Sequence, residues 1–521
     1  MIHSHNKEDS LNRRYFFKLI SNFAMLLSGV VTMILVPRSL GPAQYGNFSF
    51  LTDFFQRVTN SLGMGTSAAF FTKISQRQNE HKILIFYTYF TCVVIVVVAV
   101  FIAVCLYTDI HNAIWPDQKT PFILMAAVWA VLTWNLQNLN KVTDAYGLTV
   151  KAEKAQILQR LIAVCLIVSF FFSGRLHIGT LFIYHYLIMG VLHAFWICIL
   201  FRSRPTLLHD LQKDFRLKKE ELKLYYREFY DYCHPIIVMT FIGLFVGIFD
   251  RWLLQNYAGS VQQGFYSLSQ RIGMLCFMFT SAMTPLITRE FSVAFAENNI
   301  RHMGELFRKY IPLLYSLSAY FSCFLLFQAD NLIQIIGGEE FQGAKMAVMI
   351  MAVYPIHQTY GQLSGSVFFA TERTDLYRNI TLIFLMIGLP ITYILITPGA
   401  FGYNAGAVGL AVKMVCIQFF AVNVQLYYNT KLMNLNFWYY FFHQISCLSV
   451  FLLIAYGVSW GGEIIFKPFT ETALIKFLVS GLIYTIFIGV LIKINPKIIG
   501  ISQKQLNDFY AKMKTKVSIR K

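Results

Sequence analysis

The stretch that decides the fold is VPRSLGPAQYGNFSF, residues 36–50, which directly follows the first long apolar run. Four of its residues recur 218 positions later: Gly41, Gln44, Gly46 and Ser49 correspond to Gly259, Gln262, Gly264 and Ser267. In both places one apolar run ends, a Gly-x-x-x-x-Gly pattern turns the chain, and a second apolar run begins. We interpret the pair as the mark of two repeated halves.

The composition is that of a membrane protein. Of the 521 residues, 56% are hydrophobic and only 13% are charged. Apolar runs of about 18 or more residues recur along the whole chain, and each is long enough to cross the hydrocarbon layer. A soluble protein with buried helices does not repeat such runs so often. We therefore predict an all-α, polytopic membrane protein with about fourteen transmembrane helices, the second of them near residues 47–72.

A basic stretch at residues 202–230 divides the chain. Its Leu222, Tyr225 and Phe229 indicate an amphipathic helix on the inner leaflet. We expect four parts, an N-terminal six-helix bundle with a basic inner loop, a second six-helix bundle, two additional transmembrane helices and a basic cytoplasmic tail. Their predicted bounds are residues 1–215, 216–435, 436–492 and 493–521.

The charge distribution predicts the topology. The formal net charge is +18, and Lys and Arg cluster in alternate segments between the apolar runs. This asymmetry places both termini in the cytoplasm. No basic segment carries the interleaved aromatic pattern of a nucleic-acid module, so we expect membrane lipids and not nucleic acid as the partner.

Cysteine and histidine indicate no metal site. The nine cysteines are scattered through apolar runs without a Cys-x-x-Cys pair, so they are typical of small buried side chains. We expect no metal, no cofactor and no catalytic residue. His185, His193 and His357 lie within predicted spans, where a core histidine is the plain interpretation and proton coupling the alternative.

Charged residues inside the spans are the candidate site, because a charge costs about 2.5–3.5 kcal/mol in the centre of a membrane helix. Asp53 and Arg57 lie four residues apart on one helical face and can pair. Asn60, Met64 and Ser67 continue this stripe. Such a face avoids lipid, so it lines a wet cavity or packs on another helix.

The other charged positions lie in the second half of the repeat or just before it. Asp250 and Arg251 end the seventh span, where they form either part of the site or an outer-surface pair, with Arg251 snorkelling to water. Arg271 occupies the position equivalent to Asp53, and Lys413 lies in the twelfth span. We predict that Arg57, Arg251, Arg271 and Lys413 form a cationic cavity for phosphate or pyrophosphate, with Asp53 and Asp250 as ion-coupling or charge-pair residues.

Four segments resemble the polysaccharide-export flippases of the Wzx type. The segment Leu35–Gly46 is similar to the family signature after the first helix, and Leu62–Thr66 to its glycine-rich continuation. Phe249–Leu254, followed by Gly264–Ser267, resembles the second-half signature. The resemblance covers about residues 15–430, and the spacing of the apolar runs extends it to about 492.

The resemblance implies membership of the multidrug/oligosaccharidyl-lipid/polysaccharide (MOP) flippase superfamily. The implied fold is two six-helix bundles in a V around a central cavity, with two extra C-terminal helices here. The implied activity moves undecaprenyl-pyrophosphate-linked oligosaccharide across the bacterial inner membrane, driven by H⁺ or Na⁺. A polysaccharide polymerase and a chain-length regulator are implied partners. Related lipid II flippases carry charge within the first helix, whereas this chain has only Lys18 at its edge.

Other functions stay open at this point. A cation-coupled multidrug exporter of the same superfamily would favour carboxylates in its cavity. A membrane enzyme is the other class: a polysaccharide polymerase or ligase needs a large outer loop, a glycosyltransferase needs outer acids such as Asp109 and Asp117, and an O-acyltransferase could use His357. A structural membrane subunit without transport is a further alternative.

Overall fold

The computed structural model describes residues 11–77, 80–205, 216–281, 283–466, 472–501, 503, 504 and 507. The Leu-rich centre of the predicted inner loop, residues 206–215, and most of the predicted basic tail, residues 508–521, lie outside them. Every regular element of the described part is helical, as predicted. In lipid a helix satisfies all of its backbone polar groups internally, which is why an apolar chain adopts this structure.

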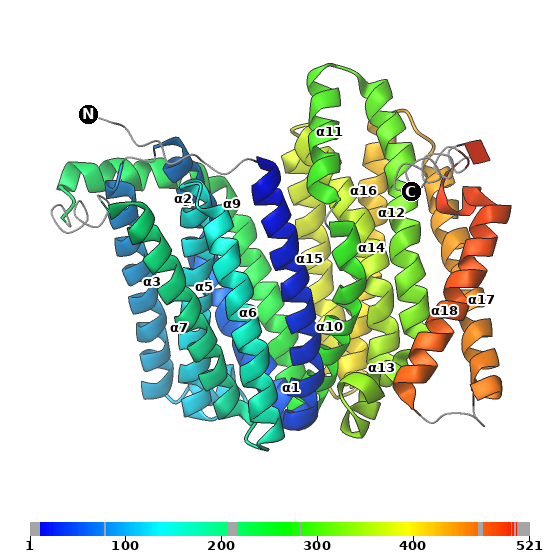
Figure 1. Cartoon of the computed structure of the whole chain (residues 1–521), viewed down its shortest axis with the longest axis horizontal. Helices are drawn as coiled ribbons and strands as arrows, with labels where there is room; N and C mark the ends of the chain where they lie inside the picture. Colours follow the sequence, from blue (N-terminus) through cyan, green and yellow to red (C-terminus); the bar gives the residue numbers. More distant parts are fainter. Residues whose placement is uncertain are drawn as a thin grey trace, which may run out of the picture. The chain divides into compact units, whose positions relative to one another are not determined.

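The chain divides into two compact units, residues 1–264 and 265–521. These units group residues by proximity and do not test the four predicted parts, whose bounds stay a prediction. The helices of the first unit are coloured blue to green in Figure 1. They are α1 (Leu11–Leu62), α2 (Thr66–Gln76), α3 (Lys82–Tyr107), α4 (His111–Ile114), α5 (Thr120–Ala145), α6 (Thr149–Phe172), α7 (Ile178–Ser203), α9 (Lys219–Leu253), the π-helix η1 (Leu254–Ala258) and the start of α10 (Gly259–Ser281).

The second unit contains the rest of α10 and the helices that follow it (Figure 1). These are α11 (Thr284–Ala296), α12 (Ile300–Phe327), α13 (Ala329–Ile336), η2 (Glu339–Ala344), α14 (Lys345–Ala370), α15 (Thr374–Ile396), α16 (Gly406–Leu432), α17 (Phe437–Phe466), α18 (Ala473–Ile494) and η3 (Pro496–Ile499).

Eleven helical stretches of the described residues are long and apolar enough to cross a membrane. Two of them, Phe16–Leu62 and Ile237–Phe277, contain 47 and 41 residues, about twice a single crossing. Each is interrupted by a non-helical glycine, Gly41 or Gly259. The predicted number of fourteen is reached when both count as two crossings and α14 is added.

The prediction of one continuous helix for the second span was wrong. This span does not run from 47 to 72, because α1 ends at Leu62 and α2 begins at Thr66. Between them Met64 and Gly65 have φ angles of 46° and 75°, which an α-helix excludes. A run of apolar residues hides such a break, because the glycine that produces it is also common within membrane helices.

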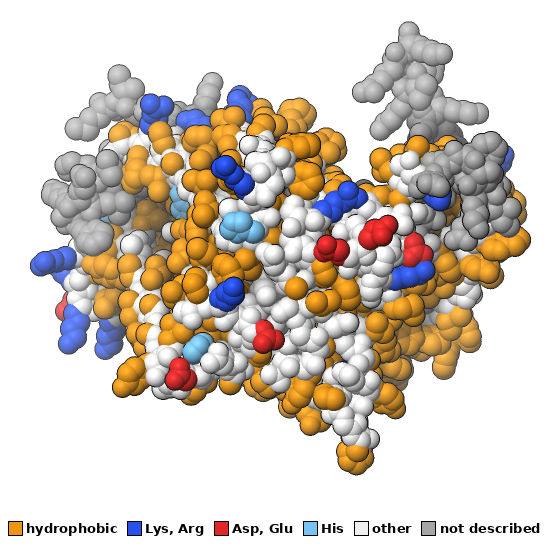
Figure 2. Space-filling model, turned by 90° about the horizontal axis from the view of Figure 1, so that it is seen from below, with side chains coloured by type: hydrophobic (Ala, Val, Ile, Leu, Met, Phe, Trp, Pro, Cys, Tyr) orange, Lys and Arg blue, Asp and Glu red, His pale blue; other side chains and the backbone are white. Residues whose placement is uncertain are grey.

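Lipid-facing surfaces are recognisable on the helices at the periphery. On α3, Val93, Val96 and Val100 are all more than half exposed, and on α18 Leu478 and Leu482 are too. Figure 2 shows hydrophobic side chains over much of the visible surface. In a soluble protein such continuous apolar patches would be a liability, so their extent agrees with a membrane location.

The core of the first unit is aromatic and lies between α2, α3, α5 and α9. Phe70 and Tyr87 stack at 3.8 Å between ring centroids, and Trp134 and Phe229 pack around them. Phe229 and its neighbour Tyr225 are therefore buried against protein. The sequence correctly predicted an amphipathic helix here. Its apolar face, however, packs on α2 and α3 and not on the inner leaflet.

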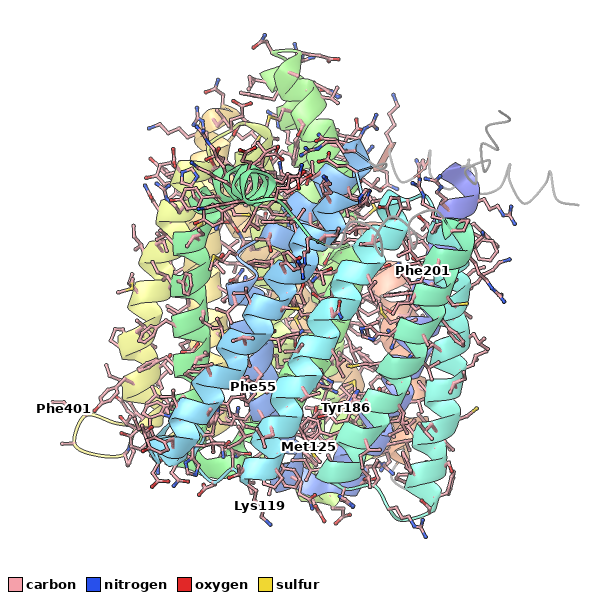
Figure 3. The ribbon with its side chains drawn as sticks, turned by 90° about the vertical axis from the view of Figure 1, so that its left-hand side faces the viewer. Phe55, Lys119, Met125, Tyr186, Phe201 and Phe401 are labelled. Atoms are coloured by element: carbon pink, nitrogen blue, oxygen red, sulfur yellow. The ribbon has the colours of Figure 1, made fainter. Side chains whose placement is uncertain are left out.

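A hydrogen bond also joins α5 and α7 within the first unit. The Tyr186 hydroxyl of α7 donates a hydrogen bond to the Met125 carbonyl of α5 (Figure 3). Lys119 at the start of α5 and Phe201 near the end of α7 lie at opposite ends of the unit in this view.

Helix α14 is the centre of the second unit. It packs against α11, α12 and α16, and its polar Thr359, Ser364 and Ser366 are buried. A helix that is shielded from lipid by other helices tolerates these side chains, which agrees with the absence of α14 from the eleven apolar stretches.

Candidate functional site

The two copies of the repeat contact each other reciprocally in the first unit. Gly41 and Gly259 have φ angles of 65° and 80°, so they supply the left-handed conformation of the two bends. Gly46 and Gly264 serve another purpose. A Cβ at Gly46 would lie 1.9 Å from the Ser260 carbonyl oxygen, and one at Gly264 would lie 2.1 Å from the equivalent Pro42 oxygen.

This reciprocity explains the spacing of the repeat. Pro42 and Ser260 each follow the first glycine of their copy. The backbone of each packs against the second glycine of the other copy. Only a residue without a side chain permits such a close approach of backbones. The sequence pattern therefore encodes a contact between the two copies of the motif, within the first unit, as well as two turns.

A hydrogen-bonded hub, centred on Asn47, adjoins this contact. The Asn47 Oδ1 atom accepts hydrogen bonds from Ser260 Oγ at 2.6 Å, Gln118 Nε2 at 2.7 Å and Gln255 Nε2 at 3.5 Å. Both glutamines also donate to the Pro116 carbonyl oxygen. Sequence analysis missed these residues. The available signal was a polar residue directly after the contact glycine, where the second copy has a phenylalanine.

The second half of α1 has one face that is not buried, and this face is polar. From residue 48 to residue 61, the only side chains that are not buried are Asp53, Gln56, Arg57, Val58 and Asn60. Four of the five are polar or charged. A lipid-facing stripe would be apolar, so this face is not of the lipid-facing kind.

Three charged side chains meet on this face. Arg57 Nε lies 2.7 Å from Asp53 Oδ2, and Arg251 Nε of α9 lies 3.8 Å from the same oxygen. The Arg57 guanidinium rests on α9 at Gly247, where an added Cβ would come within 2.1 Å of Nη1. The predicted pairing of Asp53 with Arg57 is thus present, and α9 positions both arginines around one carboxylate.

Exposure separates the roles of the two arginines. The Arg57 side chain is 35% exposed and that of Asp53 is 29% exposed, whereas the Arg251 side chain is only 8% exposed. Arg251 therefore does not snorkel to an outer surface. Asp250, its neighbour in α9, is also buried. Arg57 is the cation of this group that a ligand could reach.

The remaining predicted site residues lie in the second unit. Arg271 is exposed on α10. Lys413 of α16 is buried and extends across α15 at Gly388, where an added Cβ would lie 2.9 Å from Lys413 Cε. The structure thus brings together Asp53, Arg57 and Arg251 but places Arg271 and Lys413 in the other unit. The cavity that they would share with Arg57 stays a prediction.

Two of the three predicted membrane histidines pack against aromatic rings, and His193 Nδ1 lies 2.9 Å from the Met189 carbonyl oxygen. His185 stacks on Phe48 and His357 lies edge-on to Phe419. In the described part of the chain, no group of three or more histidine, cysteine and acidic side chains is arranged to hold a metal ion.

An ion-pair clamp, formed by Lys73, Arg77, Lys82, Glu221 and Glu228, joins α9 to α2 and its neighbour α3. Glu228 accepts hydrogen bonds from Lys73, at 2.8 Å, and from Arg77, and Glu221 accepts one from Lys82 at 2.6 Å. Burial alone would raise the pKa of Glu228, but the hydrogen bonds from Arg77 and Lys73 outweigh it and hold this pKa below its ordinary value.

We expect Glu228→Gln to loosen this clamp. Loss of two partly exposed ion pairs should cost about 1 kcal/mol and increase amide hydrogen exchange in residues 219–230. Because a lowered pKa stabilises the fold above the unfolded value, the wild-type clamp should persist at neutral pH and weaken only as the pH falls below 4.5. Glu220→Gln, in the same helix but outside the clamp, is the control. Equal exchange in all three proteins would contradict the clamp.

The fold of the described residues is that of MOP-superfamily transporters. The lipid II flippase MurJ, in an inward closed conformation, aligns with a TM-score of 0.65 and 10% identity over 91% of this chain and 99% of that chain. An inward-facing multidrug resistance MATE family transporter aligns with a TM-score of 0.59 and 16% identity over 81% of this chain and 98% of that chain. At these identities the likeness establishes the fold alone.

Residues 12–289 match the family described as polysaccharide biosynthesis protein, and the chain belongs to that family. A curated relative, the probable low-salt glycan biosynthesis flippase Agl15 of Haloferax volcanii, is 25% identical over 239 residues. This match covers 45% of this chain and 48% of the relative, so it spans about half the length of each protein. The resemblance to polysaccharide flippases and the predicted membrane fold are confirmed.

Proposed function

We propose that this protein is a flippase for undecaprenyl-pyrophosphate-linked oligosaccharide units in the bacterial inner membrane. It would serve the biosynthesis of a surface polysaccharide, such as O-antigen, capsule or exopolysaccharide. The observation that carries the proposal is the charged group of Asp53, Arg57 and Arg251 on the polar face of α1, in a chain of the polysaccharide biosynthesis family.

The depth of this group supports a transport role. Asp53 and Arg57 lie roughly 18 and 24 Å along the helix from the bend at Gly41, at 1.5 Å per residue. Both distances fall within the hydrocarbon thickness of about 30 Å. A partly exposed arginine at this depth would be costly in lipid, so it faces water or a polar ligand.

The chemistry of the group suits a diphosphate. An arginine guanidinium donates two parallel hydrogen bonds to phosphate oxygens, which a lysine cannot do. Asp53 holds Arg57 in place between transport events. An arriving pyrophosphate carries more negative charge than Asp53, so it competes for the same guanidinium while the lipid tail stays in the bilayer.

The orientation that we propose has both termini in the cytoplasm. The excess of Lys and Arg in alternate segments supports it. The clamp of α9 on α2 and α3 would then lie on the cytoplasmic side, and the contact between Gly46 and Gly264 on the outer side. H⁺ or Na⁺ would drive the cycle, and a polymerase and a chain-length regulator would use the product.

The experiment that tests this function is a flipping assay in proteoliposomes. The purified chain is reconstituted with a fluorescent undecaprenyl-pyrophosphate oligosaccharide, and the fraction protected from an external quencher is followed over time. We expect loss of protection that depends on the protein. Transport of cationic drugs without lipid flipping would favour the multidrug exporter, and a new covalent product would favour a polymerase or ligase.

A further inference from the structure

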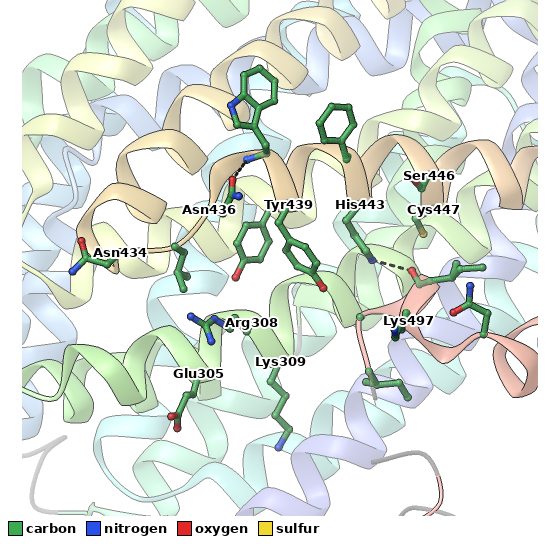
Figure 4. Close-up of a pocket in the computed structure, with 18 residues that line it drawn as sticks. Glu305, Arg308, Lys309, Asn434, Asn436, Tyr439, His443, Ser446, Cys447 and Lys497 are labelled. Carbon is green, nitrogen blue, oxygen red and sulfur yellow. Dashed lines mark hydrogen bonds between the residues drawn. The ribbon is translucent and has the colours of Figure 1, made fainter. Parts of the chain in front are cut away.

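The second unit contains a pocket of about 1430 Å³ that shares no residue with the predicted transport site. Its walls are the start of α12, the turn between α16 and α17, the first three turns of α17 and the segment around η3. All these segments meet at one end of the helices, the end that the charge distribution predicts to be cytoplasmic. Figure 4 shows Arg308 of α12 and Tyr439 of α17 reaching into the pocket from opposite walls.

The charge of the pocket is positive. Arg308, Lys309 and Lys497 line it, and none of these three forms an ion pair with any described residue. The acidic residue in the wall, Glu305, lies 3.6 Å from Arg301, measured from Oε1 to Nε. The pocket wall thus carries three cations against this one carboxylate. Three cations around one concavity attract an anion.

The walls of the pocket are firmly built. His443 Nε2 of α17 lies 2.9 Å from the Ile498 carbonyl oxygen, which fixes η3 against α17 (Figure 4). At Gly500 an added Cβ would come within 2.2 Å of Pro312 Cβ, so the same segment also touches α12. Asn436 Oδ1 accepts a hydrogen bond from Trp438 N and caps the start of α17.

The surroundings indicate a ligand that lies at the membrane interface. Trp438, Tyr439 and Phe442 are each more than half exposed at the pocket, and aromatic residues of this kind gather where lipid headgroups meet hydrocarbon. A smaller hollow of about 250 Å³, lined almost entirely by apolar side chains of α12, α17 and α18, lies beyond η3. Ile498 lines the polar pocket and the adjacent Ile499 lines the apolar hollow.

We infer that this pocket binds the phosphate headgroup of an anionic membrane phospholipid, whose acyl chain enters the apolar hollow. Arg308 and Lys497 contact the phosphate, Lys309 adds to the local potential, and Asn434, Asn436 and Tyr439 donate hydrogen bonds to the headgroup. The site differs from the proposed transport site in residues and in unit. It therefore stands whether or not the protein flips glycolipids.

The test uses the purified full chain in detergent and native mass spectrometry, with phosphatidylglycerol as the probe. We expect retained phosphatidylglycerol in the wild type and an affinity about tenfold to a hundredfold lower in the triple variant Arg308→Gln/Lys309→Gln/Lys497→Gln. The control, Arg289→Gln/Arg373→Gln/Lys431→Gln, removes the same charge from the second unit outside the pocket and should stay within about twofold of wild type.

Two further measurements with the same assay identify the ligand. Phosphatidylethanolamine, which has no net charge, should bind more weakly and respond little to the pocket variant. Excess inorganic phosphate should not displace the lipid. The inference is overturned if phosphate alone competes fully, if both lipids bind equally, or if both triple variants lose affinity equally. The single variants Arg308→Gln and Arg308→Lys extend the test if the triple variant is unstable, and only the first should lose affinity.

Discussion

Replacement of Gly46 with alanine is expected to destabilise the protein severely. The added methyl group would lie 1.9 Å from the Ser260 carbonyl oxygen, and a backbone oxygen cannot rotate away as a side chain does. The two segments must separate by more than 1 Å, which also breaks the hydrogen bond between Ser260 and Asn47. Overpacking of this kind costs about 1–3 kcal/mol or more. The measurement is the thermal unfolding midpoint in detergent, together with the yield of monodisperse protein.

Gly264→Ala should have an effect of the same size, because its methyl group would meet the Pro42 oxygen in the reciprocal contact. Gly29→Ala is the matched control, since it lies in the same helix as Gly46 and an added Cβ there has no neighbour within 4 Å. The reciprocal contact is wrong if Gly46→Ala unfolds at the same temperature as Gly29→Ala.

Removal of the Arg57 charge is the second change with a large expected effect. Arg57→Gln eliminates the partly exposed guanidinium of the charged group but retains a shorter, uncharged polar side chain. A hydrogen bond to a charged partner contributes about 1.5–3 kcal/mol, so we expect the flipping rate in proteoliposomes to fall about tenfold to a hundredfold. Arg57→Lys should recover part of the rate, because it restores the charge but not the planar fork.

Two further variants separate position from charge. Gly247→Ala should displace the Arg57 guanidinium from α9 without removing it, and we expect a smaller decrease in rate. Arg175→Gln is the control, because this exposed arginine lies in the connection between α6 and α7. If Arg57→Gln and Arg175→Gln retain the same rate at equal expression, Arg57 takes no part in transport.

Local features of the sequence predicted the structure well. Asp53 and Arg57 pair because helical spacing alone brings residues four apart together. The bends at Gly41 and Gly259 were also predictable, since the pattern stands between two membrane-length runs. What the pattern did not reveal is that the second glycine of each copy serves a contact. A glycine needed for a positive φ and a glycine needed for close approach look the same in a sequence.

Long-range features were not predictable. Arg251 joins Asp53 from a helix almost 200 positions away, and the Asn47 hub draws on three separate segments. Nothing in the local composition distinguishes Gln118 or Gln255 from any other amide. The break between α1 and α2 was missed for a different reason: hydropathy reports how apolar a stretch is and not whether its helix is continuous.

The most direct test of the central claim is the affinity of purified protein for undecaprenyl pyrophosphate, compared between wild type and Arg57→Gln. The assay measures binding by native mass spectrometry, with undecaprenol, which lacks the diphosphate, as the reference ligand. The account predicts that the substitution weakens pyrophosphate binding about tenfold or more and leaves undecaprenol binding unchanged. Equal affinity of both proteins for undecaprenyl pyrophosphate would contradict it.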